Sequence, residues 1–154
     1  MIKRSNPINK NKQELAKELI LIKDKQIKFK EKSIPSLLNI KNKLIDLKVN
    51  MTDGVWNGTK TRYVILGLMG KLEDFGIDNK KLEELNERSI KEIAKIKSES
   101  ENKAFGNSML KSNEQLIDRL LVLINTTIIN FKKEIKEWSS KKKEHLKTFK
   151  LGKK

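Results

Sequence analysis

The chain has no cysteine, one histidine (His145) and few aromatic residues. Without cysteine, disulfide bonds and thiolate ligands are excluded. No group of His, Asp and Glu has the spacing of metal ligands, and no glycine-rich loop opens a helix in the way that cradles phosphate. A lone histidine without a partner or a pocket is a poor general base. We therefore predict a protein that is not an enzyme and has no cofactor, metal or catalytic residue.

Long hydrophobic runs are also missing. The longest apolar stretch, residues 120–129, is interrupted by Asn125, Thr126 and Thr127 and falls short of the roughly 20 residues that span a bilayer. Residues 1–9 are polar and the apolar run at 19–22 is short, so no signal peptide is predicted. We expect no transmembrane segment and a cytoplasmic location, with export by a route that needs no signal peptide left open.

Two apolar tracks with heptad spacing are the main positive feature of the sequence. Each track alternates steps of four and three residues almost without a break, which places its side chains along one side of an α-helix. The period of two that strands require is absent. The first track is Leu15, Leu19, Ile22, Gln26, Phe29, Ser33, Leu37, Ile40, Leu44, Leu47 and Met51, and the second is Leu110, Glu114, Ile117, Leu121, Ile124, Ile128, Phe131, Ile135 and Trp138.

The tracks and turn residues predict an all-α fold, an elongated antiparallel bundle of three long helical segments. The segments are expected at about 11–51, 59–101 and 109–147. Polar, glycine-containing turns at 52–58 and 102–108 separate them. One helical domain should cover residues 11–149, with a disordered basic N-terminus at 1–10 and a disordered basic tail at 150–154.

Two of these segments carry helix-breaking residues. Pro35 predicts a kink or short break in the first segment, and Ser33 is a candidate cap for a restarted helix. In the middle segment, Gly76 reads as a helix stop that Asp78 follows as an N-cap. If the chain reverses at Gly76, the bundle has four elements instead of three.

The charge is strongly basic, with 35 Lys and Arg against 20 Asp and Glu, a net charge of +15. Such a charge attracts polyanions, although only four residues are arginine, the better phosphate ligand. In a three-segment bundle, residues 33–71 and 132–154 would form one basic pole that carries Trp56, Trp138 and Lys141, Lys142 and Lys143. The acidic stretch 72–101 would lie beside the start of the first helix.

Trp56-Asn57-Gly58, placed in a turn between two long helices, resembles the signature of the WXG family of small helical-hairpin proteins. That family includes the partner proteins that escort LXG-type toxins into type VII secretion. The resemblance implies that Trp56 and Gly58 form the hairpin turn, that Tyr63 is the aromatic residue early in the next helix, and that the protein folds together with a larger helical cargo.

Three functions remain open at this point. The first is a helical adaptor or chaperone that binds a helical or acidic protein, with a homodimer as one form. The second is a basic phage- or plasmid-type accessory protein that binds the nucleic-acid backbone. The third is an immunity-type protein at a membrane, with 132–154 as an amphipathic surface helix. The candidate partner-binding residues are Trp56, Gly58, Tyr63, Trp138, Lys141, Lys142 and Lys143.

Overall fold

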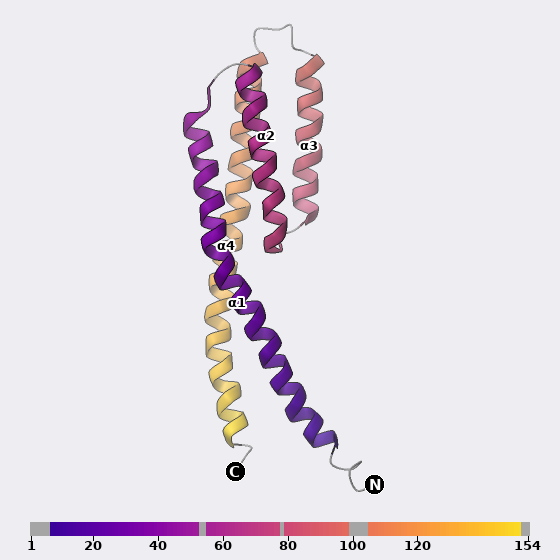
Figure 1. Ribbon diagram of the computed structural model, residues 1–154, viewed down its shortest axis with the longest axis vertical. Coiled ribbons are helices and arrows are strands. Elements are labelled where there is room, and N and C mark those ends of the chain that lie inside the picture. The colour runs from indigo at the N-terminus through magenta and orange to yellow at the C-terminus, as the bar shows by residue number, and fades with distance from the viewer. Residues whose placement is uncertain (1–6, 53–54, 78, 99–104, 152–154) are drawn as a thin grey trace. The chain divides into compact units, whose positions relative to one another are not determined.

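A computed structural model describes residues 7–52, 55–77, 79–98 and 105–151 of the chain (Figure 1). These residues form helices α1 (Pro7–Asn50), α2 (Val55–Leu72), the short 3-10 helix η2 (Glu73–Phe75), α3 (Asn79–Ser98) and α4 (Phe105–Leu151). The described ranges contain no strand. The predicted all-α fold, built from packed helices, is therefore confirmed.

The contacts within the predicted domain of residues 11–149 separate two compact units. The four-helix unit is Ile34–Ile129, and the two-helix unit is Met1–Ser33 with Asn130–Lys154. Helices α1 and α4 contribute residues to both units, whereas α2 and α3 lie entirely in the four-helix unit.

Helix α1 continues through Pro35, so the expected break and restarted helix are wrong. Ser33 does not cap a new helix. Its Oγ donates a hydrogen bond to the carbonyl of Phe29, one turn earlier, at 2.6 Å, a bond that Ser makes inside helices. α1 also begins earlier than predicted, at Pro7, where proline is tolerated because a first-turn N–H has no helical partner. The predicted disorder of residues 1–6 and 152–154 lies outside the described residues.

Gly76 ends the middle segment, as the sequence predicts. Its φ is +70°, in the left-handed region that glycine adopts readily, and its N–H bonds to the carbonyl of Glu73 at 3.3 Å. The predicted N-cap, Asp78, lies outside the described residues. Because the chain reverses here, α2 and α3 run in opposite directions within the four-helix unit (Figure 1).

This reversal breaks the middle of the three predicted segments into α2 and α3, so the bundle has the four-element form that the sequence left open. With four elements α4 runs antiparallel to α1, which two ion pairs record: Lys48 with Asp118, and Lys30 with Glu134. Residues 132–154 therefore belong with 1–33 in the two-helix unit, and 72–101 belongs to the four-helix unit. The predicted basic pole of 33–71 with 132–154 is wrong for the same reason.

Helices α2 and α4 both begin before their predicted starts, at Val55 and Phe105. Gly58 and Gly106 are helical residues and not turn residues. Side chains of all four helices form the core of the four-helix unit, including Leu82 and Leu85 of α3. Its fully buried side chains include Leu37, Leu44, Ile65, Leu72, Ile117, Leu120 and Ile124.

Candidate interaction surfaces

Trp56-Asn57-Gly58 lies in the first turn of α2, so its predicted place in the interhelical turn is wrong. Gly58 is buried where α2 meets α4. The Nδ2 group of Asn113 donates to the Gly58 carbonyl at 3.0 Å, and a Cβ at Gly58 would stand 2.4 Å from Cγ of Met109. Gly58 is therefore a close-packing residue. The side chain of Trp56 lies outside the described part of the chain.

Tyr63 and Trp138, the other two predicted aromatic contacts, have opposite environments. Tyr63 is 68% exposed on α2, in the four-helix unit, and is available to a partner. Trp138 is buried in the two-helix unit, where its Nε1 donates to Oδ1 of Asp24 at 2.8 Å. Trp138 therefore holds α1 and α4 together within the two-helix unit.

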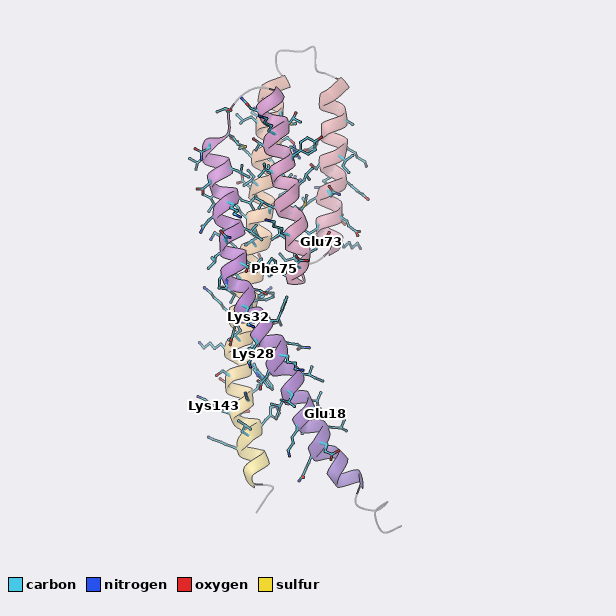
Figure 2. All side chains as sticks on the ribbon, viewed as in Figure 1. Glu18, Lys28, Lys32, Glu73, Phe75 and Lys143 are labelled. Carbon is cyan, nitrogen blue, oxygen red and sulfur yellow. The ribbon has the colours of Figure 1, made fainter. Side chains whose placement is uncertain are left out.

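Asp24 is the centre of this contact between α1 and α4. Lys142 Nζ donates to its second oxygen, Oδ2, at 2.8 Å. The hydrogen bonds from Lys142 and Trp138 favour the carboxylate and hold the pKa of Asp24 below its ordinary 3.8. Lys142 is therefore engaged within the chain, whereas Lys141 and Lys143 are exposed. Figure 2 labels Lys143 on α4.

A second contact in the two-helix unit involves Lys30. Its ammonium pairs with Glu134 and lies 5.7 Å from the centre of the Phe131 ring, within the range of a cation–π interaction. A hollow of about 380 Å³ beside the Asp24 contact is lined by Asp24, Ile27, Lys28, Glu31, Ile135, Trp138, Ser139 and Lys142. Its lining has two acidic and two basic side chains, so the hollow favours neither an anion nor a cation.

The other side of α1 carries an exposed apolar stripe. Its members are Leu15 (56% exposed), Leu19 (65%), Ile22 (53%) and Phe29 (47%). At 3.6 residues per turn, Ile22 lies roughly 140–200° around the helix from Asp24 and Ile27. The first part of the predicted heptad track is therefore uncovered, whereas Leu37, Ile40 and Leu44 of its later part are core.

Lysine predominates beside the exposed stripe. The positions that flank a heptad seam hold Lys23, Lys25, Lys30 and Lys32, of which Lys30 is paired with Glu134, and Glu18 is the acidic member of the set. Figure 2 labels Lys32 and Glu18 on α1. The sequence of the two-helix unit has 20 Lys and Arg against 7 Asp and Glu, compared with 15 against 13 in residues 34–129. The basic charge is thus concentrated in the unit that carries the stripe.

Arg62 is the main polar group inside the four-helix unit, and sequence reasoning did not predict its role. It is 1% exposed. Its Nη1 donates to Ser89 at 2.7 Å, and its Nη2 donates to Ser112 and to Glu92, the latter at 3.3 Å. Burial lowers the pKa of Arg62, but a guanidinium stays charged. The signal for this buried group in the sequence was its position, because Arg62 directly precedes the apolar residues of α2.

Two further arginines lie close to this network. A groove of about 340 Å³ between α3 and α4 is lined by Lys81, Glu84, Leu85, Arg88, Arg119, Val122 and Leu123. Arg88 and Arg119 also line a small neighbouring void that Arg62, Ser89 and Glu92 border. Three of the four arginines in the chain are therefore grouped at α2, α3 and α4.

No family model, curated protein or solved structure matches the chain. Among the described helices, none is long and apolar enough to cross a membrane. The described residues also contain no group of three or more potential metal ligands.

Proposed function

We propose that this protein is a non-catalytic helical adaptor that binds an acidic amphipathic helix of another protein along the exposed stripe of α1. The observation that carries the proposal is the exposure of Leu15, Leu19, Ile22 and Phe29 at heptad spacing. Four large apolar side chains on one helix face are typical of a seam that a partner helix covers.

The charges beside the stripe favour an acidic partner over a second copy of the chain. Flanking positions of a heptad seam face the flanking positions of the partner helix. The flanking positions of each copy carry four lysines and one glutamate, so a homodimer would bring together two seams of the same net charge, and like charges oppose such pairing. A partner with Glu or Asp at these positions would place opposite charges beside an apolar seam.

The test compares two double variants in capture from native lysate. Leu19→Ser with Ile22→Ser removes the middle of the stripe, whereas Val49→Ser with Ile90→Ser removes equally exposed apolar residues of the four-helix unit. We expect one stoichiometric protein to survive nuclease and high salt with the unchanged protein and the control, and to be lost with the stripe variant. Retention by the stripe variant would contradict the proposal, as would a stable homodimer in sedimentation that the same substitutions dissociate.

A secretion-partner role, which the resemblance to WXG proteins implies, is a narrower form of the same proposal. Only the short motif supports this role. The packing of Gly58 between α2 and α4 gives that residue a function within the chain itself. The identity of the captured protein tests it, and a larger helical cargo encoded nearby is the expected result.

Backbone-directed binding of nucleic acid is the second candidate. The observation in its favour is the concentration of basic residues in the two-helix unit, with Lys141, Lys143 and Lys147 exposed on α4. Lysine attracts phosphate without reading sequence, so such binding would be unspecific and sensitive to salt.

A further inference from the structure

We infer that the groove between α3 and α4 binds an amphiphilic anion, a carboxylate or phosphate group carried on an apolar chain. The inference concerns the four-helix unit alone and is independent of the adaptor proposal. Arg88, Arg119 and Val122 are the residues that carry it.

The use of arginine at this place is the first argument. The chain has 31 lysines and four arginines, yet Arg62, Arg88 and Arg119 border one small void. Arg62 has a structural role, since it is buried and bonded to Ser89 and Ser112. Arg88 and Arg119 are exposed, and neither has a hydrogen bond or ion pair to another described residue. Guanidinium groups bind carboxylate and phosphate through paired N–H groups, a geometry that lysine lacks.

The charge balance of the groove also favours an anion. Its lining includes three cations, Lys81, Arg88 and Arg119, and one acid, Glu84. Just behind the arginines, the charge of Arg62 is offset by Glu92, its ion-pair partner at 3.3 Å, so the excess of positive charge is that of the groove lining itself. An anionic group between Arg88 and Arg119 would offset this concentration of positive charge.

The remainder of the groove is apolar and supplies a place for the ligand's chain. Leu85, Val122 and Leu123 line it, and Val122 is 64% exposed. The volume of about 340 Å³ is at the lower end of the range of about 300–1,000 Å³ typical of small-molecule sites. Because the groove shares Leu85, Arg88 and Arg119 with the void, the cationic end of the groove is the end next to Arg62. The apolar chain would then cover Val122.

Titration calorimetry with decanoate and with decyl phosphate tests the inference. The variant is Arg88→Gln with Arg119→Gln. The control is Lys91→Gln with Lys111→Gln, which removes one exposed cation from each of the same two helices. We expect one-to-one binding of either ligand to the unchanged protein and the control, and affinity lower by about tenfold or more in the arginine variant. The stripe variant Leu19→Ser with Ile22→Ser should bind as the unchanged protein does.

Three results would overturn the inference. The first is the absence of saturable binding by both ligands, including the case in which only an acidic amphipathic peptide binds. The second is equal binding of decanol, which lacks the charge. The third is unchanged affinity in the arginine variant, with thermal melts showing that the variant is folded.

Discussion

At the scale of single residues, helix propensity and packing have opposite effects on a substitution at Gly58. Replacing a helical glycine by alanine ordinarily stabilises a helix by about 1 kcal/mol. At Gly58 the new Cβ would meet Met109 Cγ at 2.4 Å and Cβ at 3.1 Å. Because Met109 is 1% exposed, its side chain has little room to move. We expect Gly58→Ala to destabilise the protein by about 1–3 kcal/mol, measured by urea unfolding.

The same helix provides the controls for this substitution. A Cβ at Gly67 or Gly70 would have no atom within 4 Å. Gly67→Ala and Gly70→Ala should therefore leave stability unchanged or raise it by up to about 1 kcal/mol. If Gly58→Ala behaved like these two variants, the close contact between α2 and α4 would be wrong.

At the scale of elements, Asp24 makes the contact between α1 and α4 sensitive to acid. Its pKa is held below 3.8 in the folded protein by Lys142 and Trp138. The stability that it contributes is present above the unfolded value of 3.8 and is lost as the pH falls through the lower folded value. We expect the fluorescence of Trp138, isolated by Trp56→Phe, to shift to the red over this acidic range as the indole becomes exposed.

Two substitutions on α1 distinguish this contact from general acid unfolding. Asp24→Asn removes the ion pair with Lys142. The Trp138 fluorescence of this variant should therefore start closer to that of an exposed indole and should shift less in acid. Asp46→Asn changes an exposed aspartate elsewhere on α1 and should leave the profile as it was. Identical acid profiles for Asp24→Asn and the unchanged protein would exclude Asp24 as the source of the transition.

At the scale of the whole molecule, the uneven charge predicts where nucleic acid would bind. Changing Lys141, Lys143 and Lys147 to Glu alters the two-helix unit and spares Lys142, which is needed for the Asp24 contact. Changing Lys43, Lys71 and Lys91 to Glu alters the net charge equally in the four-helix unit. If DNA binds, the first variant should bind more weakly in fluorescence anisotropy. The slope of the logarithm of its binding constant against the logarithm of the salt concentration should become less steep by about 0.9 for each lost phosphate contact.

Equal weakening by the two triple variants would show that net charge alone matters. In that case the two-helix unit would have no special place in nucleic-acid binding. No measurable binding by the unchanged protein near physiological salt would remove this candidate function.

The sequence predicts those parts of the fold that local patterns determine. The heptad tracks predict helices, and Gly76 predicts the reversal that φ of +70° confirms. The pattern cannot say what covers each part of a track, so Leu15 to Phe29 look the same as Leu37 to Leu44 although one part is exposed and the other is core. Gly58 reads as a turn residue because its packing partner, Met109, is 51 positions away.

The candidate site residues were predictable only in part for a similar reason. Lys141 and Lys143 are exposed, as a lysine-rich run at the end of an apolar track indicates. The partnership of Trp138 with Asp24 depends on α4 running antiparallel to α1, and that depends on the number of elements between them. The grouping of Arg62, Arg88 and Arg119 brings together three helices, and no spacing in the sequence reports it.

The pairing of Asp24 with Trp138 also has a consequence for the order of folding during synthesis. The two residues are 114 positions apart, and the ribosome releases a chain from its N-terminus at about 5–20 residues per second. The helices of residues 34–129 can assemble while residues 130–151 are still being made. Until those residues emerge, the N-terminal half of α1 has both of its faces uncovered, so a partner helix could reach the nascent chain before α4 does.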